Sequence, residues 1–142
     1  MNALHQEHLQ SSGDGPGLHD LTGAVQAVVA RSGVVAGLCH LFLHHTSAGL
    51  VITENADPAV HRDLLRWLDR LAPADRHAYE HDTEGPDDMP AHLKAVLGGC
   101  TLTVPVAGGR CDLGTWQGIY LAEFRRAPQR RRITVSVWGS AA

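Results

Sequence analysis

The sequence lacks long apolar runs and has few aromatic residues and few cysteines, and these shortages exclude several classes of protein. No apolar stretch approaches the ~20 residues that a membrane-spanning helix needs, so we expect no membrane segment. The opening MNALHQEHLQ lacks the basic-then-apolar order of a signal peptide, which favours a cytoplasmic location. Cys39, Cys100 and Cys111 form no CxxC pair and have apolar neighbours, so we expect reduced core thiols and neither a disulfide framework nor a zinc ribbon.

An excess of positive charge is also missing. The formal net charge is −3, which gives no electrostatic reason to expect a nucleic-acid partner. The only basic cluster is local, and we interpret it as a solvated turn before the last strand; it comprises Arg125, Arg126, Arg130, Arg131 and Arg132. The 142 residues carry no obvious repeat or low-complexity tract and fit one domain, residues 1–142.

The pattern of apolar residues predicts an α+β domain with mostly antiparallel sheet. Three helices are expected: one after Asp20 or Thr22, ending at Gly33, one from Asp57-Pro58 to Pro73, and a short one from Pro90 to the glycines 98 and 99. About seven strands are expected, at residues 4–12, 34–45, 49–54, 100–106, after the hairpin turn AGGR, 117–124 and 132–138.

Ten histidines are the compositional outlier, and two of them are adjacent in FLHHTSAGLVITENADP. Because side chains alternate across a strand, His44 and His45 point to opposite faces and cannot both bind one metal from a regular strand. His45 shares its face with apolar residues, so it is either structural or directed into a cleft. The following Thr46 and Ser47 suit an anion-binding turn or a plain hairpin turn, and no G-x-S-x-G surrounds Ser47.

Two further segments carry candidate groups. His81 and His92 flank an acidic loop, and together with His45 they could form a zinc site. Alternatively, carboxylates of the loop could bind magnesium or calcium. These carboxylates are Asp82, Asp87 and Asp88. The loop could also be only a solvated surface segment. In GTWQGIYLAEF, Glu123 is either a partly desolvated reactive carboxylate or the partner of an arginine from the last strand, and Trp116 stacks on a ligand ring or fills the core.

Three segments together resemble the YjbQ family, also called the secondary thiamine-phosphate synthase family: HHTSAGLVITENADP, YEHDTEGPDDMPAHLKAVLGG and GGRCDLGTWQGIYLAEF. The resemblance runs from about Val35 to Gly139. The family motif residues fall on His45, on Glu54, Asn55, Asp57 and Pro58, on His81, on His92, on Gly114 to Gln117, and on Glu123. The sequence departs from the family pattern at residues 125–128, and at 87–88, where some relatives have Gly-Asn.

The resemblance implies an α+β sheet sandwich and a homotrimer whose sites lie between subunits. It also implies a secondary thiamine-phosphate synthase activity, which joins hydroxymethylpyrimidine diphosphate to thiazole phosphate and releases pyrophosphate. We then assign acid–base or anion-binding roles to His45, His92, Gln117 and Glu123; substrate contacts to Thr46, Ser47, Asn55, Gly114, Thr115 and Trp116; and a divalent metal, Zn or Mg, to His45, His81 and His92. The alternative is a trimeric protein that binds a metal or a small anion.

Overall fold

The computed structural model describes residues 2–11, 14–75 and 77–142, which form eight strands and three helices. Their order along the chain is β1 (Asn2–Ser11), β2 (Gly17–Asp20), α1 (Thr22–Ser32), β3 (Val34–Leu43), β4 (Ala48–Glu54), α2 (Pro58–Leu71), α3 (Asp88–Gly98), β5 (Thr101–Ala107), β6 (Arg110–Cys111), β7 (Gln117–Glu123) and β8 (Arg131–Ala141). In this described part of the chain, no helix is long and apolar enough to cross a membrane.

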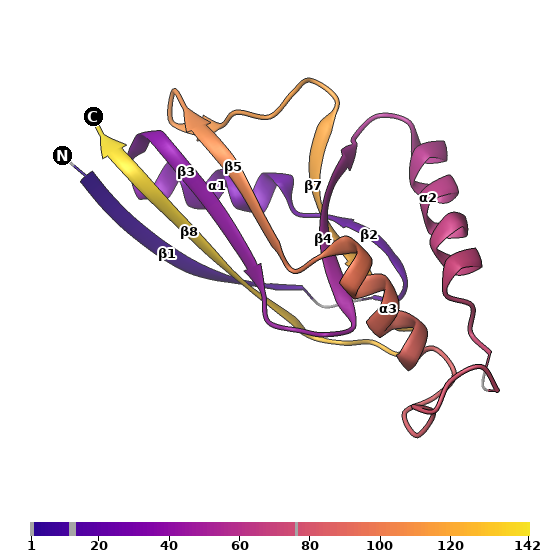
Figure 1. The fold of residues 1–142 in the computed structure, drawn as a ribbon. Helices are drawn as coiled ribbons and strands as arrows, with labels where there is room; N and C mark the ends of the chain where they lie inside the picture. Colours follow the sequence, from indigo (N-terminus) through magenta and orange to yellow (C-terminus); the bar gives the residue numbers. More distant parts are fainter. Residues whose placement is uncertain (1, 12–13, 76) are drawn as a thin grey trace.

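The strands form two antiparallel sheets, as Figure 1 shows. The larger sheet has the order β1-β8-β3-β5-β6, and the smaller has the order β2-β7-β4. The expected α+β class with antiparallel sheet is confirmed. The sequence pattern does not predict the strand β2, because the glycine-rich loop that precedes it obscures a four-residue edge strand; it pairs with the last four residues of β7, from Tyr120 to Glu123.

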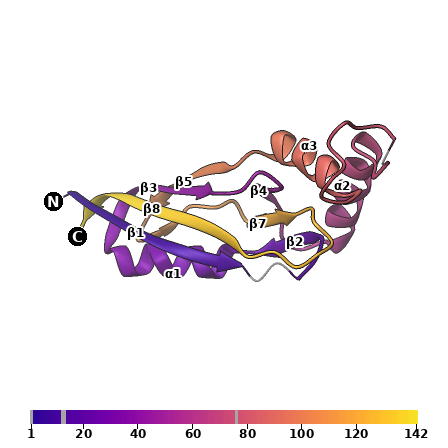
Figure 2. The same cartoon turned by 90° about the horizontal axis from the view of Figure 1, so that it is seen from below.

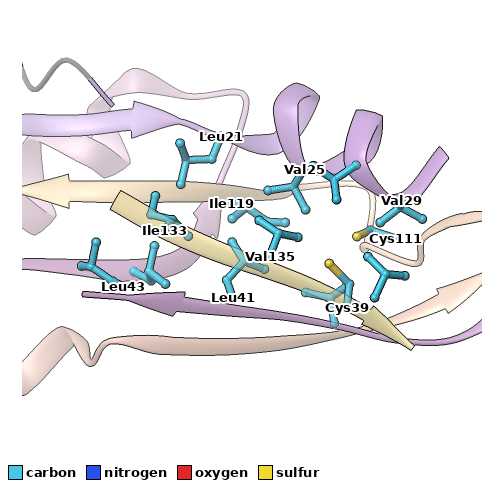
Figure 3. Packing of buried hydrophobic residues seen from close by; sticks show 14 of the residues in the cluster. Leu21, Val25, Val29, Cys39, Leu41, Leu43, Cys111, Ile119, Ile133 and Val135 are labelled. Carbon is cyan, nitrogen blue, oxygen red and sulfur yellow. The ribbon is translucent and has the colours of Figure 1, made fainter. Parts of the chain in front are cut away.

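The core lies between the two sheets and α1, which Figure 2 shows beneath the larger sheet. In Figure 3, Val25 and Val29 of α1 face the strands, and Val25 lies nearest to Ile119 of β7, with Val135 of β8 and Leu41 of β3 beyond it. All five side chains are fully buried. From Cys39 to Leu43, the buried side chains of β3 alternate with more exposed ones, as the period of a strand requires.

The other face of the larger sheet is open to solvent. Leu4, Trp138 and Leu38 lie in register across three neighbouring strands, and each is about half exposed or more. Because α1 and the smaller sheet both cover the opposite face, a flat surface with large apolar side chains remains uncovered in a single chain.

Three sequence expectations need correction. Residues 44–47 form no hairpin turn, because β3 and β4 belong to different sheets and the segment crosses from one sheet to the other. The spacing of Val60, Leu64, Trp67, Leu68 and Leu71 predicts a buried apolar stripe on α2. Of these residues only Leu68 is buried, while Trp67 and Leu71 are about half exposed, since α2 covers only part of the smaller sheet. Of the three thiols expected in the core, Cys100 is exposed.

Candidate metal centre

The start of α3 brings a carboxylate and a histidine onto one face. The helix begins at Asp88, two residues before the expected Pro90, so Asp88 lies in its first turn. His92 follows four residues later, and residues at this spacing are neighbours on a helix surface. Their polar atoms meet, with His92 Nε2 3.1 Å from Asp88 Oδ2.

His81 and Glu84, from the loop before α3, complete this cluster. His81 Nε2 lies 2.5 Å from the same oxygen of Asp88, and 3.6 Å from a carboxylate oxygen of Glu84. One ligand atom from each of His81, Glu84, Asp88 and His92 lies within 4.8 Å of the others. Asp88 is only 2% exposed, so the cluster is built around a buried carboxylate.

A backbone carbonyl sets the orientation of His92. Its Nδ1 lies 2.9 Å from the carbonyl oxygen of Thr46, which can only accept a hydrogen bond, so Nδ1 carries the proton. Nε2, which faces Asp88, is thereby the nitrogen that can bind a metal. Such a hydrogen bond from the outer nitrogen is the usual way in which proteins orient a metal-binding histidine.

The charges around Asp88 favour its ionised form. Burial opposes ionisation, but the hydrogen bond with His81 and the charge of Arg125 outweigh it, so the pKa of Asp88 lies below its usual value. The hydrogen bond to Asp88 raises the pKa of His81 in turn. A proton on His81 therefore competes with a cation for the position next to Asp88.

Arg125 holds the cluster from outside. Its Nη1 donates to Asp88 Oδ1 at 2.5 Å, its Nη2 donates to the carbonyl oxygen of Glu84 at 3.0 Å, and its Nε lies 3.2 Å from Asp87. Asp87 also accepts the backbone N–H of Arg126. Residues 87–88 and residues 125–126 are thus in direct contact.

His45 does not join the cluster. Its Nε2 accepts the backbone N–H of Arg132 at 2.8 Å, which occupies the lone pair that a metal would need. Burial lowers the pKa of His45, and the positive charge of Arg131 lowers it further, so this imidazole stays neutral. The predicted separation of the adjacent histidines is present, because His44 turns to the open sheet face and contacts Thr134.

Glu123 is the partner of an arginine from the last strand. Its two carboxylate oxygens accept hydrogen bonds from Nε and Nη2 of Arg131, at 2.7 and 2.6 Å. Both side chains are buried. The same guanidinium donates to the carbonyl oxygen of Ser47. Of the two alternatives for Glu123, the structural ion pair is the one present, and Arg131 is not part of a solvated turn. The carbonyl oxygens of Thr46 and Ser47 accept hydrogen bonds from His92 and Arg131.

The remaining predicted residues form a separate corner. Asn55 Nδ2 donates to the carbonyl oxygens of Thr115 and Gln117, and the Gln117 side chain accepts the backbone N–H of Gly114. Trp116 is 63% exposed and does not fill the core. This corner follows β4, whereas His92 contacts Thr46, which precedes β4. The six spacings between the seven residues of β4, at ~3.4 Å each, place the two groups about 20 Å apart.

Glu54, at the same corner, has a local structural role. Its carboxylate accepts the backbone N–H groups of Ala56 and Asp57, both at 3.1 Å. Asp57 then caps α2 by accepting the N–H of Ala59, as its position before Pro58 predicts. Both carboxylates therefore stabilise the turn that leads into α2 by accepting its backbone N–H groups.

A cavity of about 470 Å³ adjoins the cluster. His45 and His92 both line it, and most of its wall is made by small or apolar residues of α3 and its surroundings; the lining residues are His45, Thr46, Ala48, His92, Ala95, Val96, Gly99 and Cys100. Its volume lies within the range of small-molecule sites. His45 therefore faces the space beside the cluster without belonging to the cluster.

The sequence model of the family described as UPF0047 protein YjbQ-like matches residues 7–140. The chain belongs to this family. It is 47% identical over 135 residues to a UPF0047 protein of Synechocystis, covering 95% of this chain and 92% of the relative. It is 43% identical over 136 residues to the UPF0047 protein YjbQ of Escherichia coli O157:H7, covering 95% and 98%.

Solved structures of UPF0047-like proteins have the same fold. A YbjQ-like protein of unknown function from Sulfolobus solfataricus superposes with a TM-score of 0.89 at 28% identity, covering 99% of this chain and all of the other. A conserved hypothetical protein from Thermus thermophilus gives a TM-score of 0.81 at 38% identity, covering 91% and 97%. The α+β fold expected from the resemblance is therefore confirmed by these structures.

Sequence reasoning finds His81 and His92 and names Asp88 as one of three carboxylates that could hold a cation, but it misses Glu84 and Arg125. It counts Arg125 among the arginines of a solvated turn and does not single out Glu84 in the acidic loop. The four-residue spacing from Asp88 to His92 is the available signal. This spacing does not indicate a shared site if the helix is expected to begin at Pro90. Only a helical turn that includes Asp88 places both side chains on one face.

Proposed function

We propose that this protein binds a divalent metal ion through His81, Glu84, Asp88 and His92. The observation that carries the proposal is the convergence of two imidazole nitrogens and two carboxylate oxygens within 4.8 Å. The buried Asp88, held from outside by Arg125, distinguishes this cluster from an ordinary group of exposed acids.

The donor set favours zinc over magnesium. Zinc accepts nitrogen and oxygen ligands in a four-coordinate arrangement, whereas magnesium prefers an octahedron of oxygens and waters. His81 and His92 both reach Asp88 Oδ2 through hydrogen-bond contacts, and a dication would replace the protons in those contacts. Only small side-chain shifts separate these atoms from coordination distance.

A thiamine-phosphate synthase-type transfer is the reaction that we propose for this centre. In that reaction a bond forms between the thiazole nitrogen and the pyrimidine methylene carbon, while the bond from that carbon to the diphosphate oxygen breaks. A bound cation would stabilise the negative charge of the departing diphosphate. The cavity lined by His45 and His92 has room for an aromatic ring, and the neutral His45 places an uncharged imidazole beside it.

The proposal includes a homotrimer in which neighbouring chains share a site. One chain keeps the corner of Asn55 and Gln117 about 20 Å from His92, so a site that uses both groups needs a second chain. The uncovered apolar side chains of the larger sheet, including Trp138, support such an assembly. The free thiols of Cys39 and Cys111 support a reducing, cytoplasmic location.

Metal content and activity test the proposal together. We expect the purified protein to bind about one Zn²⁺ per chain, and His92→Ala to weaken binding by more than about 100-fold, because the substitution removes a ligand and not merely its support. His77→Ala is the matched control, since His77 is an exposed histidine outside the cluster. Product formation from the two precursors should follow metal occupancy. Zinc binding that is unchanged in His92→Ala would exclude this centre.

A further inference from the structure

We propose that Arg125 determines which divalent ions the centre accepts, by keeping one oxygen of Asp88 out of coordination. This inference rests on the proposed metal centre. It concerns a residue that binds no metal itself and acts only through the carboxylate that it contacts.

The two oxygens of Asp88 have separate partners. Oδ1 accepts a hydrogen bond from Nη1 of Arg125 at 2.5 Å, whereas Oδ2 faces His81 and His92 at 2.5 and 3.1 Å. A charged donor at this distance is a strong partner for a carboxylate oxygen. Only Oδ2 is therefore directed toward the position between the two histidines.

Several contacts prevent Arg125 from releasing this oxygen. Its guanidinium also binds the Glu84 carbonyl and Asp87, and its side chain is only 15% exposed. Its backbone N–H donates to Glu123 Oε2, and the buried Arg131 fixes that oxygen from the other side. Arg125 is thus anchored at both its backbone and its side chain. Asp88 cannot turn both oxygens toward a cation while these contacts persist.

A carboxylate restricted to one oxygen favours ions of low coordination number. With single donor atoms from His81, Glu84, Asp88 and His92, the chain offers four ligands, the number that zinc commonly takes. Larger or harder cations such as Mn²⁺ prefer more oxygen ligands, and a bidentate carboxylate is a common way to supply them. Arg125 therefore lowers the affinity of the centre for these ions more than its affinity for zinc.

The experiment compares Zn²⁺ and Mn²⁺ affinities in four forms of the full chain: wild type, Arg125→Met, Arg125→Lys and Arg126→Met. Arg126→Met is the matched control, because it removes the same charge from the next residue. Within the described residues, the Arg126 guanidinium makes no ion pair, and only its backbone N–H contacts Asp87. Competition titration with a chromophoric chelator gives both dissociation constants, and the absorption spectrum of bound Co²⁺ reports the coordination number.

We expect Arg125→Met to shift the affinity ratio toward Mn²⁺ by about tenfold, within the range by which outer contacts tune metal sites. Its Co²⁺ spectrum should lose the intensity typical of a four-coordinate ion. Arg125→Lys should give a smaller shift, because an ammonium group keeps the charge but not the planar fork. Arg126→Met should leave the ratio unchanged.

The possible failures are distinguishable. If Arg125→Met and Arg125→Lys weaken both metals equally and the Co²⁺ spectrum is unaltered, Arg125 has only a structural role and the inference is overturned. If Arg125→Met does not fold, the ratio measured for Arg125→Lys decides alone. If the wild type binds neither metal, the proposed function fails, and this inference fails with it.

Discussion

At the scale of single residues, the chemistry of the centre depends on which atom faces which. Asp88 is the clearest case, because one carboxylate oxygen accepts a hydrogen bond from Arg125 and the other contacts His81 and His92. Strand alternation, a local rule, is enough to separate His44 from His45. No local rule points to Arg125, whose side-chain partners Asp88, Asp87 and Glu84 lie 37, 38 and 41 residues away along the chain.

The contact between His81 and Asp88 predicts a pH-dependent stability of the metal-free protein. The raised pKa of His81 means that its stabilising effect is present below 6.5 and is lost as pH rises through the folded-state pKa. The lowered pKa of Asp88 means that its contribution is present above 3.8 and is lost as pH falls through its folded-state value. We therefore expect His81→Asn to lower the melting temperature most at about pH 5, with a difference that shrinks toward about pH 9.

Thermal unfolding in the presence of a chelator measures this effect. Glu7→Gln in a His5→Gln background serves as the comparison, because Arg31 holds the pKa of Glu7 at about 2, below the usual 4.5, and the change at residue 5 removes the histidine that hydrogen-bonds Glu7. The ion pair of Glu7 with Arg31 is complete above pH 4.5, so in that background the effect of Glu7→Gln should stay constant between about pH 5 and about pH 9. A His81→Asn difference that also stays constant over that interval would contradict the predicted linkage.

At the scale of elements, the start of α2 and the path of β5 follow from local signals. Asp57-Pro58 begins a helix as expected, and β5 buries the valines at 104 and 106 in alternation. The start of α3 and the strand β2 do not follow, because a four-residue edge strand and a helix preceded by Gly-Pro carry weak local patterns. The two-residue error at α3 conceals the face shared by Asp88 and His92.

The ion pair between Glu123 and Arg131 ties β7 in the smaller sheet to β8 in the larger sheet. Both side chains are buried, with the carboxylate fully covered. We expect Glu123→Gln to reduce the free energy of unfolding by about 3–5 kcal/mol, because it leaves a buried guanidinium without its counter-charge. Urea unfolding with a fitted midpoint and slope measures the loss.

The paired substitution Glu123→Leu with Arg131→Met separates the ion pair from simple packing. Because apolar residues can replace a buried pair with little cost, the double variant should recover most of the stability that Glu123→Gln loses. The exposed pair of Asp63 and Arg66 in α2 provides the control, and Asp63→Asn should have a much smaller effect. Equal losses in Glu123→Gln and Asp63→Asn would show that the inter-sheet tie has no special importance.

At the scale of the whole molecule, the family motifs are distributed between two distant places. The corner formed by Asn55 and the 114–117 loop lies at one end of β4, and His92 contacts the other end. A single chain gives these motifs no common site. A trimer whose subunits share sites, as proposed, would bring them together, and assembly would then be a condition for the proposed activity.

Mixing two inactive variants tests this condition. We expect His92→Ala and Asn55→Ala each to lose synthase activity as pure proteins. After they are unfolded together and refolded, mixed trimers should regain up to about a quarter of the activity, because some interfaces then combine two intact halves. Light scattering should give about three times the 15.3 kDa chain mass. Unaltered trimers that regain no activity on mixing would place the complete site within one chain.

The sequence by itself determined the antiparallel α+β class, most strands, the start of α2 and the opposite directions of His44 and His45. These features depend on side-chain periodicity and on capping, which act between residues close in the chain. Only the tertiary structure decided that Glu123 pairs with Arg131, that His45 stays outside the cluster, and that Asp88 stands between Arg125 and two histidines. Those outcomes depend on which distant segments the two sheets bring together, and no local pattern encodes that packing.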